Sequence, residues 1–335
     1  MVTLAQGFAE RGLVVDVVLV RAGGPFLEEL PPDVRVVDLK SSRTLVALPK
    51  LAYYLATKRP RAVLATLRHA NIAAWLARCI SRTSMPIVFR ETNARSLGAL
   101  ARFCYARVEG VVALSAAARE KLVSQGVPTD KVKLIYNPAN TPDIDIKARE
   151  EVVHSYFYGA RKIILAVGRL VREKDYPTLI RSIKILRKKS NVKLLILGEG
   201  GRRGDLENMI VEEGLEEFVS MPGFVENPFA YMRAADLFVL SSASEGLPNA
   251  LIQAMACGTP VVSTDCPTGP NEILQDGKWG RLVPVGDAEA LASAMAAALD
   301  DPSPPDVRTR AADFSVDKAV DAYLDALGLK PAPSR

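Results

Sequence analysis

Two kinds of segment alternate along the chain, and this alternation limits the available folds more than any other feature. Short runs rich in β-branched residues recur, and segments with the apolar spacing of a helix lie between most of them. The runs of the first part are 13–20, 34–39, 62–67, 87–90, 110–115 and 132–136. Those of the second part are 162–167, 193–197, 218–221, 236–240, 260–264 and 281–283. The repetition predicts parallel sheets that carry helices on both faces.

A loose, polar segment after Asn137-Pro138 separates the two series of strands. With 335 residues, the chain has the length of two domains. We predict an α/β fold of two Rossmann-like, doubly wound domains that face each other across a cleft. The first covers 1–139 and the second 161–313, with a linker over 140–160. A C-terminal helix over 314–328 is predicted to follow, with the first domain as a candidate packing partner, and 329–335 as a disordered tail.

Composition narrows the class of protein. Hydrophobic residues make up 49% of the chain and charged residues 24%, as in folded enzymes. Charged residues interrupt every apolar run before it reaches the ~18 residues that a membrane-spanning helix needs. The first residues lack the features of an export signal, and the four cysteines show no paired spacing. We therefore expect a cytoplasmic protein with buried, reduced thiols.

Charge is distributed unevenly along the chain. Residues 1–140 contain 20 Lys and Arg against 10 Asp and Glu, whereas the net charge of the whole chain is +5. A basic field of this kind draws a protein toward an anionic surface. We expect a lipid-linked acceptor, or peripheral docking on the anionic inner face of a membrane; a solvated basic face is the alternative. Nucleic acid is not expected as a partner, because no aromatic recognition module accompanies the scattered cations.

Two cations follow the first strand of the second domain. Gly168 and Arg169 come directly after that strand, and Lys174 precedes Asp175 and Pro177, the predicted N-cap and first-turn residue of a helix. A guanidinium can hold two phosphate oxygens, an ammonium adds a point charge, and a helix start offers free N–H groups. The loop therefore predicts a phosphate site, with two solvent-facing cations as the alternative.

Glycines follow the next two strands. Gly198 and Gly200 resemble a dinucleotide-binding loop only weakly, because that loop follows the first strand of its domain and has an acid about 20 residues further on. Close approach of the backbone to a ligand is the hypothesis that remains. Gly223 and Phe224 follow the third strand, where Phe224 is either a surface for a nucleobase or a buried loop anchor.

An acid precedes the helix predicted over 248–257. Glu245 lies in the loop after the strand 236–240, just ahead of the free N–H groups at the helix start. Carboxylates accept hydrogen bonds from sugar hydroxyls, and backbone N–H groups donate to phosphate. An N-cap role is the competing interpretation, although glutamate is not a preferred cap. The donor-binding candidates here are Gly246, Leu247, Pro248 and Asn249.

These stretches together resemble a known family. GRLVREKDYPTLI, LGEG, GF and SEGLPNALIQAMACGTPVVSTDCPTGPNEIL look like the donor half of a retaining glycosyltransferase of family 4, which has the GT-B fold. The resemblance covers about residues 105–300 and implies that Arg169 and Lys174 hold the donor diphosphate. It also implies that Glu245 contacts the donor sugar. Gln253 stands where the family has a second acid that binds the ribose, and we expect its uncharged amide to bind the ribose diol of the donor with altered strength.

The first domain departs from the family pattern. Family members begin with a strand and a glycine-rich loop, whereas this sequence starts at the helix that follows, so we expect the first domain to lack its first, central strand. We also expect a chain without that strand not to be fully active. No residue matches a catalytic histidine securely. The acceptor-side candidates are His69, Asn71, Glu91 and Asn93, and a structural role is the alternative for His69.

Metal and cofactor are not expected. Asp143 and Asp145 form a D-x-D pair, which binds metal in another glycosyltransferase fold, but here the pair falls in the predicted linker. We interpret it as two solvated acids, and no other cluster has metal-ligand spacing.

The resemblance implies transfer of a sugar from a nucleoside-diphosphate sugar, with a UDP-sugar expected, to a glycan or lipid-linked acceptor. Retention of the anomeric configuration and a role in cell-surface polysaccharide synthesis are part of this expectation. Two alternatives remain: a sugar-nucleotide epimerase of the same architecture, and an inactive homologue that binds the nucleotide sugar.

Overall fold

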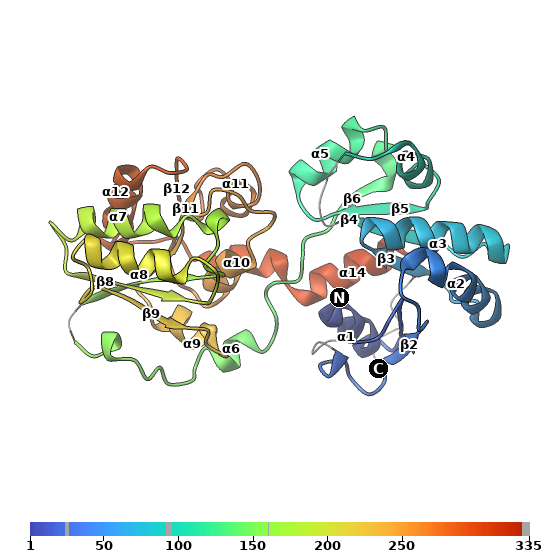
Figure 1. Cartoon of the computed structure of the whole chain (residues 1–335), viewed down its shortest axis with the longest axis horizontal. Helices are drawn as coiled ribbons and strands as arrows, with labels where there is room; N and C mark the ends of the chain where they lie inside the picture. Colours follow the sequence, from blue (N-terminus) through green and yellow to red (C-terminus); the bar gives the residue numbers. More distant parts are fainter. Residues whose placement is uncertain (24–26, 92–95, 160, 330–335) are drawn as a thin grey trace. The chain divides into compact units, whose positions relative to one another are not determined.

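The computed structural model describes residues 1–23, 27–91, 96–159 and 161–329. Its contacts divide the chain into two units (Figure 1). The first contains residues 1–138 together with the segment from 316 onward, and the second contains residues 139–315.

The second unit is built on one six-stranded parallel sheet. Its strands are β7 (Lys162–Val167), β8 (Val192–Leu197), β9 (Val219–Gly223), β10 (Leu237–Leu240), β11 (Val261–Thr264) and β12 (Arg281–Val283). They are arranged in the order β12-β11-β10-β7-β8-β9. The order reverses between β7 and β10, and open α/β sheets bind ligands beyond the carboxyl ends of the strands at such a reversal.

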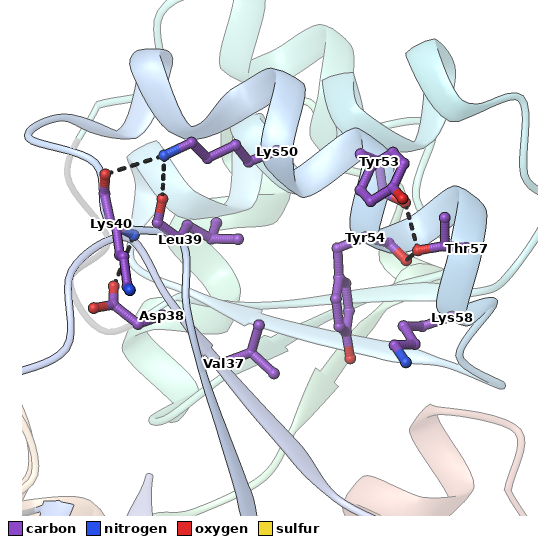
Figure 2. Close-up of a pocket in the computed structure, with 9 residues that line it drawn as sticks. All are labelled: Val37, Asp38, Leu39, Lys40, Lys50, Tyr53, Tyr54, Thr57 and Lys58. Carbon is purple, nitrogen blue, oxygen red and sulfur yellow. Dashed lines mark hydrogen bonds between the residues drawn. The ribbon is translucent and has the colours of Figure 1, made fainter.

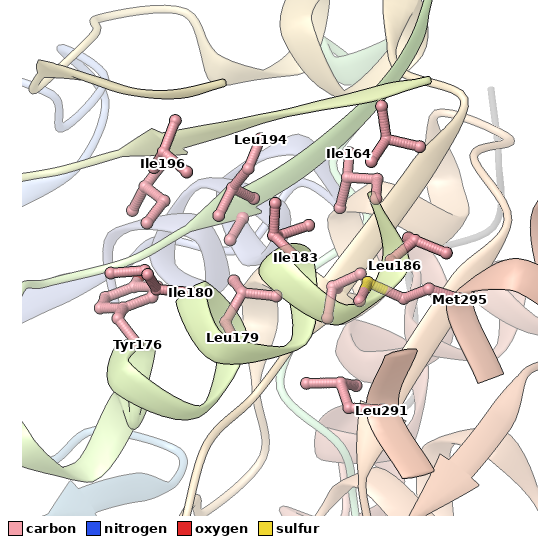
Figure 3. Close-up of a cluster of buried hydrophobic side chains, with 14 of the residues drawn as sticks. Ile164, Tyr176, Leu179, Ile180, Ile183, Leu186, Leu194, Ile196, Leu291 and Met295 are labelled. Carbon is pink, nitrogen blue, oxygen red and sulfur yellow. The ribbon is translucent and has the colours of Figure 1, made fainter. Parts of the chain in front are cut away.

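Helices cover both faces of this sheet. On one face lie α7 (Tyr176–Leu186), α8 (Arg203–Glu212) and α12 (Ala288–Leu299). Figure 3 shows their core, in which Leu179 and Ile183 of α7 pack against Ile164 and Leu194 of the strands. The apolar residues of α7 recur every three or four positions, so one side of the helix is buried. The elements α9 (Pro228–Ala234), α10 (Asn249–Ala256), α11 (Pro270–Leu274) and α13 (Val307–Ala311) complete the unit.

The first unit contains two separate parallel sheets. One pairs β1 (Asp16–Leu19) with β2 (Arg35–Asp38). The other has the order β3 (Val63–Thr66), β4 (Ile87–Glu91), β5 (Gly110–Ala113) and β6 (Val132–Leu134). In the described residues, no strand bonds to both β1 and β3, so each keeps one edge without a strand partner. The first domain thus differs from the single continuous sheet that a doubly wound domain would form.

Helices also cover both faces of the four-stranded sheet. Phe89 and Val111 point to a core shared with α3 (Arg68–Ser81), α4 (Ala99–Tyr105) and α5 (Ala116–Ser124). Their neighbours Val88 and Val112 point to the opposite face, because side chains alternate along a strand. There they contact α1 (Val2–Glu10) and α14 (Val316–Ala326). The helix α2 (Thr44–Lys58) packs on α3.

The segment from 140 to 160, expected as a linker, forms part of the second unit. It contains α6 (Ile144–Lys147) and a 3-10 turn over Ser155–Phe157, and Asn227 donates to the backbone oxygen of Lys147 at 2.8 Å. Asp143 forms an exposed ion pair with Lys147 at 2.8 Å. Of the tail predicted for 329–335, only Leu329 is described; its amide donates to the oxygen of Leu324 at 2.8 Å. Residues 330–335 lie outside the described residues.

Candidate functional site

The predicted donor residues lie around the reversal of strand order in the second unit. Gly168, Arg169 and Lys174 follow β7, whereas Glu245 follows β10, the neighbour of β7 in the sheet. The two loops leave the carboxyl ends of adjacent parallel strands and therefore meet at the same edge of the sheet. Residues 71 positions apart are brought together in this way.

The central contact joins a cation to an anion. Lys174 Nζ donates to Glu245 Oε1 at 2.6 Å, and the hydroxyl of Ser242 donates to the same oxygen at 2.7 Å. The side chains of Lys174 and Glu245 are 18% and 13% exposed, so the ion pair is largely shielded from water. Charge-assisted hydrogen bonds of this length hold the carboxylate in one orientation.

Hydrogen bonds to the backbone tie the two loops together. The hydroxyl of Ser241 donates to the backbone oxygen of Lys174 at 2.8 Å, and the amide of Ala243 donates to the oxygen of Glu173 at 2.8 Å. The hydroxyl of Thr268 donates to the backbone oxygen of Glu245. Sequence reasoning missed this support. The two serines, three and four positions before Glu245, were the signal that could have indicated it.

Arg169 stands apart from this pair. Its side chain is exposed and has no hydrogen-bond or ion-pair partner within the described part of the chain. The guanidinium therefore keeps all of its donors available, five in an arginine. Of the three residues predicted to act together, the structure brings Lys174 and Glu245 into contact, and Arg169 extends from the same loop as Lys174.

Gly168 makes room for the side chains above β7. A Cβ at this position would lie 3.1 Å from Cε of Lys174 and 3.0 Å from the hydroxyl of Tyr176. Burial raises the pKa of Tyr176, and the nearby Glu245 raises it further, so the tyrosine is a neutral hydrogen-bond donor. Asp175 precedes α7 as predicted, but its side chain makes no capping hydrogen bond.

The glycines after β8 have a packing role that the sequence did not indicate. A Cβ on Gly198 would lie 2.0 Å from the backbone oxygen of Gly168, and one on Gly200 would lie 2.4 Å from that of Leu170. Gly198 also has a φ of +141°, which strongly favours glycine. These glycines thus let the loops after β7 and β8 touch. Close approach to a ligand remains a hypothesis beside this observed role.

Phe224 is 77% exposed, so the prediction of a buried loop anchor is wrong and its ring is accessible. It follows Gly223 at the end of β9, where φ is +100° and a Cβ would lie 2.8 Å from Oε1 of Glu199. Glu199 forms an ion pair with Arg203 at 2.7 Å. Gly223 thus faces this charged pair, and the exposed ring of Phe224 follows it directly at the end of β9, an edge strand of the sheet.

The helix after Glu245 begins one residue later than predicted. It covers Asn249–Ala256, and Gly258 beyond its end has a φ of +85°, as expected for a residue that ends a helix. Gly246 and Asn249 are exposed, whereas Pro248 is buried. Leu247 and Gln253 are partly buried. The first amides of this helix are the donors predicted to face a phosphate.

The acceptor-side candidates have different surroundings. His69 is exposed on α3, but Asn71 is fully buried and donates to Tyr105 at 3.0 Å. Glu91 is 3% exposed, accepts from the same tyrosine hydroxyl and forms an ion pair with Arg68 at 3.6 Å. Asn71 and Glu91 therefore belong to a polar network inside the first unit. Asn93 lies outside the described residues.

Three further expectations concern metals, membranes and thiols. Within the described ranges, no group of three or more His, Cys, Asp or Glu residues is gathered as a metal site would require. The described helices include none with the length and apolar character to cross a membrane. Cys104, Cys257 and Cys266 are buried free thiols, whereas Cys79 is exposed, contrary to the expectation for all four.

Both units consist of parallel sheets covered by helices, and solved glycosyltransferases with the GT-B fold are similar in structure to the chain. Two family models match consecutive parts of the chain: Glycosyltransferase Family 4 over residues 1–142, and Glycosyl transferases group 1 over residues 149–313. The chain belongs to glycosyltransferase family 4.

Curated glycosyltransferases are also similar to the chain in sequence. A diphospho-undecaprenol 4-α-N-acetylgalactosaminyltransferase of Campylobacter jejuni is 32% identical over 222 residues, which are 65% of this chain and 59% of the relative. The lipopolysaccharide core biosynthesis glycosyltransferase LpsE of Rhizobium meliloti is 35% identical over 178 residues, half of each chain. The matched part thus spans only about half the length of these relatives.

Solved structures support the fold over nearly the whole chain. HepE of Anabaena, crystallised with UDP, has a TM-score of 0.78 and 21% identity, and the match covers 98% of this chain and 96% of HepE. A glycosyltransferase of Rickettsia africae has a TM-score of 0.84 and 16% identity, with 97% and 92% of the two chains covered. Because both identities are below 25%, these similarities establish the fold alone.

Proposed function

We propose that the chain transfers a sugar from a UDP-sugar to a glycan or lipid-linked acceptor, with retention of the anomeric configuration, in cell-surface polysaccharide synthesis. The observation that carries this proposal is the contact between Lys174 and Glu245 at the reversal of strand order. The UDP bound to HepE and the lipid-linked substrate named for the Campylobacter relative support the choice of donor and acceptor.

The chemistry follows from the charges at the site. Negative charge develops on the departing diphosphate, and fixed cations stabilise it most when water is largely excluded. Arg169 would hold two phosphate oxygens through its free guanidinium, with the amides at the start of α10 as further donors. Lys174 would bridge the diphosphate and Glu245, whose other carboxylate oxygen would accept from a sugar hydroxyl.

Retention is proposed to occur by attack on the same face of the sugar that the diphosphate leaves. The leaving phosphate oxygen takes the proton of the acceptor hydroxyl, so the bond to the acceptor forms as the bond to phosphate breaks. No metal is needed in this scheme, because Arg169, Lys174 and backbone N–H groups carry the positive charge. Activity should therefore persist when a chelator is added.

A donor screen tests the proposed reaction. We expect UDP-sugars to raise the melting temperature more than GDP- or ADP-sugars, and one of them to give a glycosylated product with a lipid-linked acceptor. The anomeric configuration of that product, measured by NMR, should match that of the donor. Donor binding without product from any acceptor would instead indicate an inactive homologue. Isomerisation of the donor without an acceptor would indicate an epimerase.

The basic first unit is proposed to bind the anionic inner face of a membrane from the cytoplasm. Exposed apolar side chains accompany its cations, among them Leu45 on α2 and Leu100 on α4, which are 74% and 54% exposed. Each Lys or Arg near such a surface contributes about 1 kcal/mol. Co-sedimentation with vesicles should increase with the fraction of anionic lipid and decrease with salt. Binding that is independent of anionic lipid would refute this proposal.

A further inference from the structure

Tyr176, the first residue of α7, combines a buried ring with a hydroxyl that no described group binds. The residue is 3% exposed, and its ring belongs to the apolar core between the sheet and α7 (Figure 3). Across the described residues, no hydrogen bond reaches its hydroxyl oxygen. That oxygen is also not one of the fully buried polar atoms that lack a partner there, so the small exposed part of Tyr176 includes the hydroxyl. The hydroxyl thus lies at the surface of the core.

Two comparable tyrosines use acceptors from the protein. Tyr54, which lines a pocket between β2 and α2 (Figure 2), donates a hydrogen bond to Asp16. Tyr105 is fully buried and donates to Glu91. A hydroxyl removed from water without a hydrogen bond destabilises a fold, so such groups usually have partners. Tyr176 departs from this pattern, and the partner of its hydroxyl is therefore water or a ligand.

The hydroxyl of Tyr176 lies among the residues of the proposed donor site. A Cβ on Gly168 would lie 3.0 Å from this oxygen and 3.1 Å from Cε of Lys174, so the two side chains border one small space beside that glycine. Glu245, which accepts from Lys174 at 2.6 Å, is near enough to affect the ionisation of the tyrosine. Because Gly168 has no side chain, it leaves this space open to an atom of a ligand.

Tyr176 keeps its proton at neutral pH. Burial raises the pKa of its hydroxyl, and the negative charge of Glu245 raises it further, because both disfavour the phenolate. An anion bound nearby would act in the same direction. The hydroxyl is therefore a neutral hydrogen-bond donor that the buried ring holds in one position. A phosphate oxygen accepts such a bond, and an ammonium group already lies next to the same space.

We propose that the hydroxyl of Tyr176 donates a hydrogen bond to a phosphate oxygen of the donor diphosphate, beside the contact made by Lys174. This inference rests on the proposed function and adds to it a donor-binding residue without charge. The ammonium supplies charge on a flexible stem, whereas the tyrosine supplies direction. Its ring is already fixed in the core, so little conformational entropy is lost when the diphosphate binds.

Tyr176→Phe removes the hydroxyl and keeps the buried ring. Its melting temperature should not fall, because no hydrogen bond of the described structure is lost. Affinity for UDP, measured by isothermal titration calorimetry, should fall about tenfold or more, since the lost bond is one to a charged group. The control Tyr158→Phe removes a hydroxyl from a residue of the same unit that is 67% exposed, and should leave the affinity unchanged.

The possible results separate this inference from the proposed function. If the unchanged chain binds UDP and Tyr176→Phe binds it with an affinity within about twofold, the inference is wrong and the proposed function stands. Equal losses in Tyr176→Phe and Tyr158→Phe would also contradict the inference. If the unchanged chain does not bind UDP, the proposed UDP-sugar donor is refuted together with the inference.

A double-mutant cycle tests the place of the contact. In Gly168→Ala, the added methyl group would lie in the space beside the hydroxyl and keep the phosphate from it, so the later loss of the hydroxyl should matter less. Tyr176→Phe should therefore lower UDP affinity less in this background than in the unchanged chain. Gly204→Ala is the control, because a Cβ on this exposed glycine of α8 would meet no atom within 4 Å. Equal losses in the three backgrounds would overturn the proposed contact.

Discussion

Replacement of Arg169 by alanine should lower kcat/KM by about 10²–10³-fold, the loss typical of one group that stabilises charge in the transition state. The reason is that Arg169 is exposed and unpaired within the described residues, so its donors are available to a donor diphosphate. The same fact predicts an unchanged melting temperature, because no contact in the described structure is lost. The measurement is steady-state kinetics with the UDP-sugar selected by the donor screen.

Lys189→Ala is the matched control for Arg169→Ala. Lys189 is also an exposed cation of the second unit, but it lies beyond the end of α7, away from the loops that carry Lys174 and Glu245. It should leave kcat/KM within a factor of about two, because isolated surface charges contribute little. If both variants lose activity equally, the effect is one of net charge, and the assignment of Arg169 to the diphosphate fails.

Replacement of Tyr323 by alanine should destabilise the first unit by about 3–5 kcal/mol, as for other large aromatic side chains removed from a core. Tyr323 belongs to α14, is fully buried and packs edge-to-face on Phe8 at a ring distance of 6.5 Å. The expected loss approaches the whole stability margin of many domains, about 5–15 kcal/mol. Urea unfolding monitored by tryptophan fluorescence measures it.

The two tryptophans allow the units to be followed separately. Trp75 lies in the first unit and Trp279 in the second. In a Trp279→Phe background the remaining Trp75 therefore reports unfolding of the first unit. In a Trp75→Phe background the remaining Trp279 reports unfolding of the second. The control Tyr323→Phe removes only the hydroxyl that accepts from Nε of Arg90 at 3.1 Å, and should cost about 1–3 kcal/mol. A Tyr323→Ala variant that alters unfolding only in the Trp75→Phe background would disprove the role of α14 in the first unit.

The positions of the strands followed closely from local pattern. The predicted run 162–167 became β7 and the run 281–283 became β12 with the same bounds. In the first unit, 13–20 shortened to β1, Asp16–Leu19, because only these residues have parallel partners on β2. Periodicity reports burial directly, whereas the ends of a strand depend on where its neighbour ends. The short helix α4 was not predicted, since seven residues give too little periodicity.

The residues of the candidate site were predicted less completely. Glu245 and Lys174 were chosen because they follow strands, and the structure brings them together. The support by Ser242 was missed: the serine is a signal for a hydrogen bond near Glu245, but serine before a helix start is common, and the pattern does not identify its partner. Gly198 was assigned to a ligand, but its clearest neighbour is the backbone of Gly168. A glycine pattern indicates that a side chain would not fit at a position, but it does not indicate which group lies next to it.

The sequence by itself determined the alternation of strands and helices, the basic first part and the family, since each depends on residue types at short spacing. Tertiary structure decided three other matters: that α14 returns to the first unit, that the first unit has two sheets, and that Lys174 pairs with Glu245. These depend on contacts between residues far apart in the chain. Local preference contains no information about such contacts, because packing of whole elements, and not the spacing along them, decides which distant side chains meet.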